Sequence, residues 1–376
     1  MKEKIKILMV LGNTGRGGSQ AYVMTVFRNI DKTKFQVDFV ASFTEDNDYS
    51  EEIKELGGTL YLLPRFNMLN YFSFCKSWNS FFYEHHYDIV HGHATGAASI
   101  YLSIAKRRGC ITVSHSHSDG YRGGVFARLL KYLLAKRVRT VSDYWFSCSS
   151  KAAERLYGLE YKTFERYYEM PNAIDVEKYK YDPQVRENVR KALGVGSKTI
   201  LYGHVGSFSV PKNHKFLLEV FRSIHEKDKS SKLLLVGSGP LETEVLSFIA
   251  AYELTDSVIL KGTVSNVPDY LYAMDAMIFP SLFEGFGIAV LEAEASGLYT
   301  IVSDNIPKEV CIVDCVKRLS LEDSIQLWVD GALSIPSLNR EHYNDIVSKT
   351  KYNINTSIQQ IQELYIQMYK ERLHNN

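Results

Sequence analysis

Short apolar runs alternate with amphipathic segments along nearly the whole chain. The apolar runs predict buried strands, and the segments between them carry apolar residues at helical spacing. In the first half we expect strands at residues 4–12, 35–42, 59–64, 87–93, 111–117, 145–149 and 167–174, with helices at 19–30, 50–57 and 97–109. Continuous apolar strands separated by helices indicate a parallel sheet that is covered on both faces.

The same pattern starts again in the second half. Strands are expected at residues 198–207, 232–239, 257–264, 276–281 and 299–304, with helices at 215–224, 241–254 and 288–297. A charged stretch at 175–198 predicts the boundary between the halves. The pattern therefore predicts an α/β protein with two doubly wound, Rossmann-like parallel-sheet domains facing across a cleft. We assign residues 1–180 and 181–355 to them, and 356–376 to an amphipathic helix that packs back on the first domain.

Composition limits the class of protein. The 376 residues include 44 Lys and Arg against 43 Asp and Glu, a net charge of +1, which argues against a globally basic nucleic-acid binder. The five cysteines form no C-x-x-C pair, as expected for buried thiols in a reducing compartment. The apolar run at residues 5–11 is too short for a signal peptide, and no run reaches the roughly 20 residues of a membrane-spanning helix. We expect a cytoplasmic protein.

Glycines and histidines follow the strands of the first half. Gly12, Gly15, Gly17 and Gly18 come after the first strand but do not form G-x-G-x-x-G, so a dinucleotide fingerprint is absent. Glycines before a helix favour an anion or a sugar close to the backbone, and a plain flexible turn is an equal alternative.

Two histidine pairs, His91 with His93 and His115 with His117, end neighbouring strands. Residues two apart lie on one side of a strand. The histidines could bind metal, hold a sugar or transfer protons. No carboxylate spacing favours a metal, and we predict no metal ligands.

In the second half, Lys212 lies just before a helix, where a cation and free backbone N–H groups suit a phosphate. A solvated surface lysine is the alternative. Gly237 ends the next strand and would let a ligand approach the backbone.

The stretch PSLFEGFGIAVLEAEASG, residues 280–297, carries two carboxylates around a glycine turn. The backbone N–H groups of Gly287 and Ile288 would suit a diphosphate at the start of a helix. Glu292 could accept hydrogen bonds from a ribose diol, and Glu284 from a sugar hydroxyl. The alternative is a capping glutamate followed by an exposed helical one.

These motifs resemble those of the retaining glycosyltransferases of family 4, which have the GT-B fold. The E-x7-E pair from Glu284 to Glu292 lies in FPSLFEGFGIAVLEAEASG, which resembles the signature block of the family. LLLVGSGPLE, MPNAID and GGSQAY resemble further elements in the same order, with Ala173 in place of a glycine. The paired HSHSD and the ending SDNIPKEV look most like bacterial exopolysaccharide and capsule enzymes.

The resemblance implies roles for individual residues. Catalysis would involve His117, with His115 as its alternative, together with Glu284 and Lys212. Many members have an arginine where this chain has Ser207, and Arg16 could supply the missing charge. The residues expected to contact the donor are Gly17, Gly18, Ser207, Lys212, Gly237, Gly262, Thr263, Glu284, Gly285, Phe286, Gly287, Ile288 and Glu292.

The resemblance implies an enzyme that moves a sugar from a UDP-linked donor to a saccharide or lipid-linked acceptor in cell-surface polysaccharide synthesis. The anomeric configuration would be retained without metal, and no cofactor would be permanently bound. The alternatives are a UDP-sugar epimerase and a non-catalytic nucleotide-sugar binding protein. The basic, leucine-rich residues 127–139 predict either peripheral contact with the inner face of the membrane or an ordinary half-buried helix.

Overall fold

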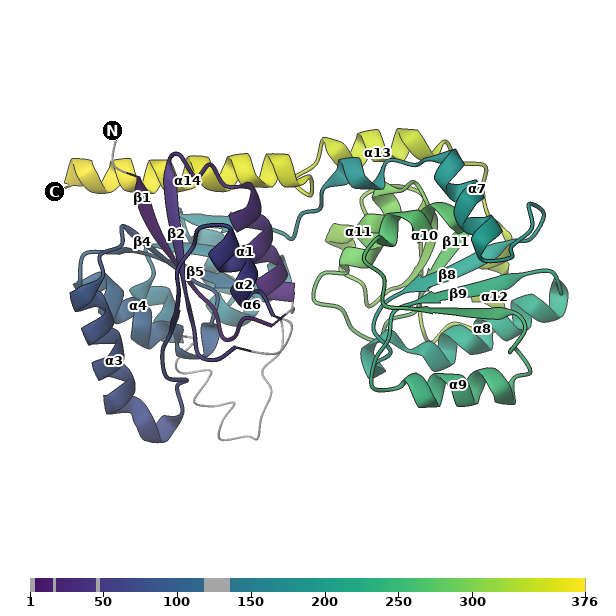
Figure 1. The fold of residues 1–376 in the computed structure, drawn as a ribbon, viewed down its shortest axis with the longest axis horizontal. Coiled ribbons are helices and arrows are strands. Elements are labelled where there is room, and N and C mark those ends of the chain that lie inside the picture. The colour runs from purple at the N-terminus through teal and green to yellow at the C-terminus, as the bar shows by residue number, and fades with distance from the viewer. Residues whose placement is uncertain (1–3, 16–17, 45–47, 118–135, 376) are drawn as a thin grey trace. The chain divides into compact units, whose positions relative to one another are not determined.

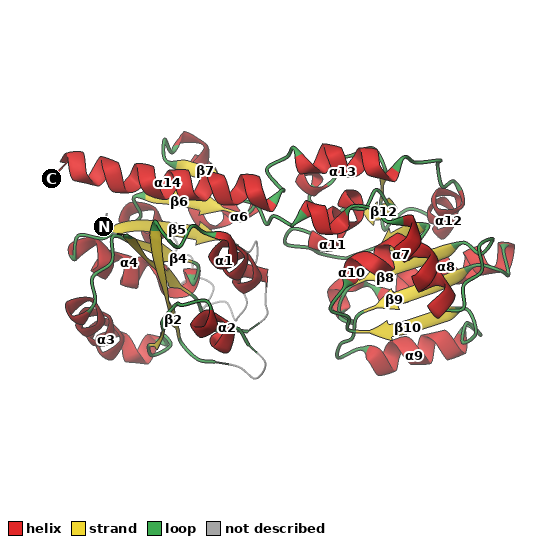
Figure 2. Cartoon of the chain, turned by 45° about the horizontal axis from the view of Figure 1, so that its top comes forward, coloured by secondary structure: helices red, strands yellow, loops and turns green. Residues whose placement is uncertain are grey.

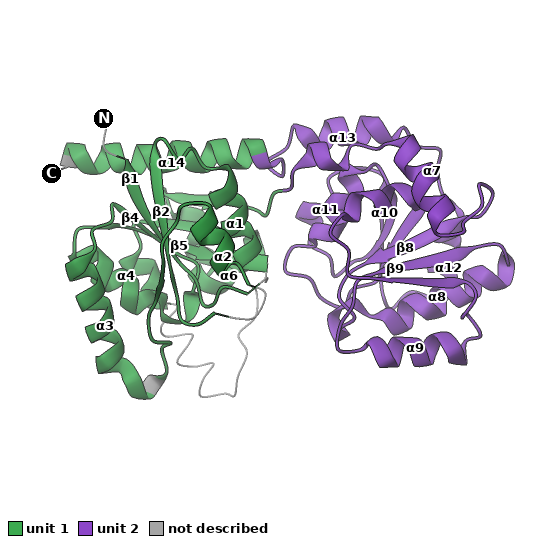
Figure 3. Ribbon diagram, viewed as in Figure 1, with its two compact units in different colours: residues 1–173, 355–376 green, residues 174–354 purple. Residues whose placement is uncertain are grey.

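The chain forms two compact units, residues 1–173 with 355–376 and residues 174–354 (Figure 3). The structure is a computed structural model, and it describes residues 4–15, 18–44, 48–117 and 136–375. Three of the sequence-based expectations fall elsewhere, because Arg16, Gly17 and most of the basic segment 127–139 lie outside the described residues.

The first unit contains a seven-stranded sheet in the order β3-β2-β1-β4-β5-β6-β7, and its described strand pairs are all parallel (Figure 1). The strands are β1 (Ile5–Val10), β2 (Phe35–Ala41), β3 (Leu60–Leu62), β4 (Ile89–Gly92), β5 (Ile111–Ser116), β6 (Tyr144–Ser147) and β7 (Tyr167–Glu169). The order reverses between β1 and β4, and in such sheets ligands bind beyond the carboxyl ends of the strands at that point.

Helices from both ends of the chain pack on this sheet. They are α1 (Gly18–Asn29), α2 (Ser50–Glu55), α3 (Tyr71–Glu84), α4 (Ala98–Arg107), α6 (Ser150–Tyr157) and α14 (Ile354–Asn375). All of α14 except Ile354 belongs to this unit. The Tyr365 hydroxyl lies 2.6 Å from Nδ1 of His91, and the Gln362 side chain accepts a hydrogen bond from the backbone of Asp31. The last helix is therefore part of the first unit's packing.

The second unit contains a six-stranded parallel sheet in the order β10-β9-β8-β11-β12-β13. Its strands are β8 (Leu201–Val205), β9 (Lys232–Val236), β10 (Val258–Gly262), β11 (Ala276–Phe279), β12 (Tyr299–Ser303) and β13 (Val316–Leu319). Here the order reverses between β8 and β11. Both predicted doubly wound parallel sheets are thus confirmed.

Helices cover both faces of the second sheet (Figure 2). They are α7 (Pro183–Ala192), α8 (His214–Lys227), α9 (Glu242–Ala251), α10 (Val267–Ala273), α11 (Ile288–Ala295), α12 (Ile325–Leu333) and α13 (Arg340–Ser348). Alternate residues of β11 enter different cores. Met277 and Phe279 pack with α10, α11 and α13, whereas Ile278 packs with α8, α9 and α12. This period of two explains why the strand reads as continuously apolar.

Six of the described helices lie where the sequence pattern predicted none: α3, α6, α7, α10, α12 and α13. The charged stretch 175–198 contains α7, which begins at Pro183 after Asp182, whose side chain caps it. Helix α3 follows β3, with Phe74, Trp78 and Phe81 buried at helical spacing. The exposed aromatic residues Tyr71, Phe72 and Tyr83 flank the buried ones and obscured that period.

Candidate functional site

Lys212 and Glu284 form an ion pair beyond the carboxyl ends of β8 and β11. The Lys212 Nζ atom lies 2.5 Å from Oε1 of Glu284, and the Ser281 hydroxyl donates a hydrogen bond to the same oxygen at 2.9 Å. Both side chains of the pair are largely shielded from solvent. Two predicted site residues, 72 positions apart, therefore meet where the strand order of this sheet reverses.

The local backbone fixes the position of Lys212. A short 3-10 helix, η5 (Val210–Lys212), ends at Asn213, which has a left-handed conformation with φ of 55° and leads into α8. The Leu282 N–H donates to the carbonyl of Pro211 at 2.8 Å, so the two turns are tied together. The Lys212 Nζ atom also lies 4.6 Å from the centre of the Phe279 ring, within cation–π range.

The start of α11 has no side-chain cap among the described residues. Gly287 precedes the helix with φ of 93°, a left-handed conformation that favours glycine. The first N–H groups of a helix lack partners within the helix and carry its positive dipole end. The predicted amides of Gly287 and Ile288 thus belong to an uncapped helix start near Lys212.

Glu292 lies one turn further along α11 and is partly buried. The Tyr179 hydroxyl donates a hydrogen bond to its Oε1 atom at 2.7 Å. Burial raises the pKa of Glu292 to about 7, against the opposing effects of the Tyr179 hydrogen bond and the charge of Lys212. Sequence patterns did not single out Tyr179, which lies 113 positions earlier in η4 (Val176–Tyr179).

The predicted glycines lie where β9 and β10 end. Gly237 has φ of 138°, and a Cβ atom added to it would lie 2.1 Å from the carbonyl oxygen of Gly206. Its N–H donates to the carbonyl of Gly262 at 2.8 Å. Next to them, the hydroxyls of Ser238 and Thr263 are 2.8 Å apart. This close backbone approach requires glycine at position 237.

Three other residues of this unit that were predicted to contact the sugar donor differ in exposure and packing. Ser207 is exposed, and its hydroxyl lies 3.0 Å from that of Ser209. The Phe286 ring is buried and packs against Tyr352 at 5.5 Å between ring centres, so its side chain serves the core. Gly285 has open space around its Cα atom.

The four predicted histidines form one cluster in the first unit. The Nε2 atom of His91 lies 3.2 Å from Nδ1 of His115, and Nδ1 of His93 lies 2.7 Å from Nε2 of His117. The rings within each strand stack, with centres 4.2 Å apart for His91 and His93. Gly18, predicted to lie near the donor, begins α1 in this unit.

Burial disfavours the charged form of all four histidines. Burial lowers the pKa of His117 to about 3 and the pKa values of His91, His93 and His115 well below their usual range. Nitrogen atoms of the last three lie within 4.8 Å of one another, close enough to consider a metal. Nε2 of His91 and Nδ1 of His115 already form a hydrogen bond to each other, as do Nδ1 of His93 and Nε2 of His117. The arrangement fits hydrogen bonding to a ligand better than proton donation.

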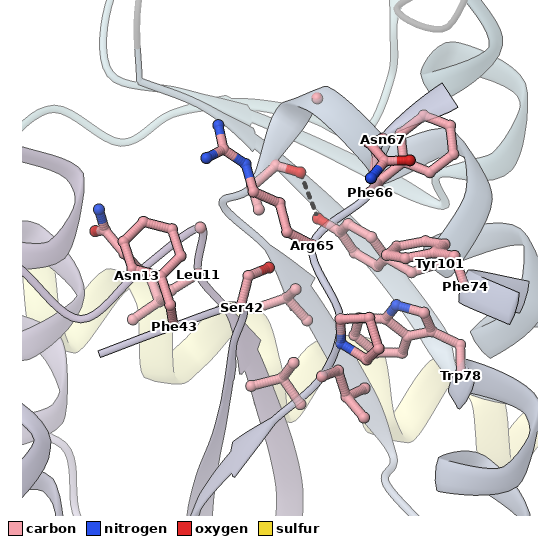
Figure 4. A pocket seen from close by; sticks show the side chains of 18 residues that line it. Leu11, Asn13, Ser42, Phe43, Arg65, Phe66, Asn67, Phe74, Trp78 and Tyr101 are labelled. Atoms are coloured by element: carbon pink, nitrogen blue, oxygen red, sulfur yellow. Dashed lines mark hydrogen bonds between the residues drawn. The ribbon is translucent and has the colours of Figure 1, made fainter. Parts of the chain in front are cut away.

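A pocket of about 470 Å³ lies at the reversal point of the first sheet, beyond the carboxyl ends of β1, β2 and β4. Figure 4 shows Phe74, Trp78 and Tyr101 on one side of it and Asn13 and Phe43 on the other. The Trp78 indole N–H has no hydrogen-bond partner among the described residues. The sequence reading found the glycines at one rim, but not this aromatic wall.

Two protein families match the chain. Residues 16–178 match the model described as Glycosyltransferase Family 4, and residues 185–351 match the model described as Glycosyl transferases group 1. The first match covers most of the first unit and extends to residue 178, and the second lies within residues 174–354.

Several curated relatives are similar over most of their length. EpsF of Bacillus subtilis, named as a glycosyltransferase, is 29% identical over 98% of both chains. CapH of Staphylococcus aureus, named as a capsular polysaccharide biosynthesis glycosyltransferase, is 22% identical over 96% of this chain and 99% of its own. An Escherichia coli UDP-Gal:alpha-D-GlcNAc-diphosphoundecaprenol alpha-1,3-galactosyltransferase is 28% identical over 75% of this chain and 76% of its own.

A solved structure has the same fold. Anabaena HepE, crystallised in complex with UDP and glucose, superposes with a TM-score of 0.75 at 17% identity, covering 96% of this chain and 99% of its own. With both sheets, the E-x7-E turn and the two family matches in place, the chain belongs to glycosyltransferase family 4 and has the GT-B fold.

Proposed function

We propose that this glycosyltransferase moves a hexose from a UDP-sugar to a lipid-linked saccharide, with retention of the anomeric configuration and without a bound metal. The observation that carries the proposal is the Lys212–Glu284 pair beside the uncapped start of α11. A cation and free N–H groups suit a diphosphate, and carboxylates suit sugar hydroxyls.

The ion pair holds both groups ready for a donor. In the pair, Lys212 and Glu284 satisfy each other's charge in a largely shielded position. A diphosphate would replace the carboxylate as the partner of Lys212, and a hydroxyl of the transferred sugar would become the partner of Glu284. Glu292 would accept hydrogen bonds from the ribose. Lys212 and the α11 amides would stabilise the charge that develops on the departing UDP.

The choice of donor and acceptor is supported by the relatives. HepE was crystallised with UDP and glucose, and the Escherichia coli relative is named for a UDP-galactose donor and a diphosphoundecaprenol-linked acceptor. We assign the acceptor to the same chemical class. The part of His117 stays a prediction, and its neutral imidazole fits a hydrogen bond to a substrate hydroxyl.

Replacing Lys212 tests the proposal. We expect Lys212→Ala to lower kcat/KM for transfer by about a hundredfold to a thousandfold, because a cation that stabilises the leaving group contributes roughly 3–4 kcal/mol. The neighbouring exposed Lys215→Ala is the matched control and should transfer as the unchanged protein does. Equal rates for Lys212→Ala would remove the diphosphate assignment.

Product analysis separates the remaining functions. Transfer with retention gives an α-linked product from an α-linked donor by NMR, and activity should survive a chelator. An epimerase would release UDP and a free altered sugar without an acceptor. The exposed Ser207, at the position where the family resemblance implies an arginine, favours a non-catalytic sensor as the second candidate. Tight UDP-sugar binding with no turnover on any acceptor would establish that role.

A further inference from the structure

The segment that forms one wall of the first-unit pocket also carries an outward aromatic edge. It consists of the 3-10 helix η1 (Met68–Asn70) and α3, which Figure 1 places at the margin of the unit with the first turn of α3 at the bottom of the view. We define the α3 edge as Leu69, Tyr71, Phe72, Lys76 and Tyr83, all exposed. Leu69 is 99% and Phe72 is 87% exposed.

The α3 edge is held in shape by its own hydrogen bonds. Asn67 and Asn70 form a reciprocal capping box, in which each side chain accepts from the other's backbone N–H, at 3.0 and 2.8 Å. The buried face of α3 anchors the helix through Phe74, Trp78 and Phe81. The capping box and the buried face therefore hold this segment in place, and the side chains of the α3 edge stay exposed outside the core.

Helical spacing gathers part of the edge into one stripe. Phe72, Lys76 and Tyr83 follow each other at intervals of four and seven, which places them on the same side of α3. The rings of Tyr71 and Phe72 meet edge to face at 5.6 Å between centres. Aromatic side chains with a cation among them are typical of surfaces that enter the headgroup region of a bilayer.

The charged residues around the α3 edge also favour an anionic lipid surface. Between Glu55 and Glu84 the sequence contains no Asp or Glu, and its two charged residues are Arg65 and Lys76. Arg65 lies at the pocket, with its guanidinium 5.8 Å from the centre of the Phe43 ring. No carboxylate of the described chain forms an ion pair with Arg65. Cations without acidic neighbours are attracted to anionic lipid headgroups.

We propose that the α3 edge is a membrane-contact surface that seats the first unit on an anionic lipid bilayer. Leu69 and Phe72 enter the headgroup region, and Lys76 lies at the phosphates. The pocket lined by Arg65, Phe66 and Phe74 then opens beside the lipid surface, where the head of a lipid-linked saccharide is available. This last step rests on the proposed transfer to a lipid-linked acceptor, whereas binding to the bilayer does not.

Vesicle sedimentation of the full chain tests the surface. The variant Leu69→Ser/Phe72→Ser changes two almost fully exposed side chains, and Leu159→Ser/Leu246→Ser, also exposed, is the matched control. We expect the unchanged protein and the control to bind vesicles of phosphatidylcholine and phosphatidylglycerol, and the first variant to bind at least about tenfold more weakly, because two apolar anchors are lost. Added salt should weaken the binding of the unchanged protein.

Two outcomes of the vesicle experiment would contradict the proposal. Equal binding by the Leu69→Ser/Phe72→Ser variant overturns the proposal, as does failure of the unchanged protein to bind. A dimer in sedimentation velocity that the variant abolishes, without vesicle binding, would instead assign the edge to a second copy of the chain.

A transfer assay separates this inference from the proposed function. One acceptor is a saccharide on a polyprenyl diphosphate in the vesicles, and the other is the same saccharide on a short water-soluble chain. We expect the variant to lose about tenfold of its rate on the first acceptor alone, in proportion to the lost binding. If the variant and the unchanged protein transfer at equal rates on each acceptor, the membrane-contact surface is refuted and the transferase function is unaffected. Transfer to neither acceptor by the unchanged protein, with vesicle binding intact, would remove the acceptor assignment and leave the surface.

Discussion

At the scale of single residues, Glu292 combines burial with a neutral hydrogen-bond donor. Its pKa is raised to about 7, whereas the ordinary value is 4.5, so the folded protein holds a proton on it that the unfolded chain has released between those pH values. Its contribution to folding stability is therefore greatest below pH 4.5 and falls as the pH rises to about 7. A ribose diol donates hydrogen bonds most strongly to the ionised form, so stability and donor binding favour opposite protonation states.

We expect UDP to bind more tightly as the pH rises from about 6 to about 8, because Glu292 ionises in this range. The Tyr179 hydrogen bond lowers the pKa of Glu292, so Tyr179→Phe should move the midpoint of this dependence to higher pH. Calorimetric titration of UDP across the range measures it. Tyr270→Phe, in the same unit, is the control, and a Tyr179→Phe profile that coincides with it would exclude Glu292 as the titrating group.

At the scale of elements, the site depends on turns that only certain residues can form. Gly237 ends β9 with φ of 138° against the carbonyl of Gly206. Gly237→Ala should lower the free energy of unfolding by about 1–3 kcal/mol from backbone strain alone and weaken UDP binding, since the Gly206 turn leads to Lys212. Gly196→Ala is the control, because an added Cβ atom there would meet its nearest neighbour at 3.7 Å. Denaturant melts of both variants are the measurement, and equal midpoints would refute the expected strain.

Sequence patterns predicted the elements whose burial repeats within a short window. The apolar runs of β8, β9, β11 and β12 were sufficient to place those strands, and the E-x7-E spacing singled out Glu284 in the turn and Glu292 in α11. Contacts between distant positions left no such signal. Tyr179 and Glu292 are 113 positions apart, and Tyr365 and His91 are 274 apart. The membrane expectation for residues 127–139 falls largely outside the described residues, whereas the α3 edge became visible only once exposure was known.

At the scale of the whole molecule, each unit has its own sheet and its own cores. All the described residues that we assign to donor contact, apart from Gly18, lie in residues 174–354, an uninterrupted stretch. We expect this stretch, expressed alone, to fold and to be stabilised by UDP. A ligand present at a hundred times its Kd should add about 2.7 kcal/mol to the free energy of unfolding. Calorimetry of the fragment with and without UDP decides. A folded fragment that UDP does not stabilise would show that donor binding needs the rest of the chain.

Along the described residues, no helix is both long enough and apolar enough to cross a bilayer.

The packing of α14 on the first sheet has a consequence for how the protein is made. Domains usually fold in the order in which the ribosome delivers them. Here the helix that brings Tyr365 against His91 is translated after the entire 174–354 stretch. The part of the first sheet that α14 covers therefore stays uncovered while residues 174–354 are synthesised and can fold. The part of the chain that emerges first is completed last.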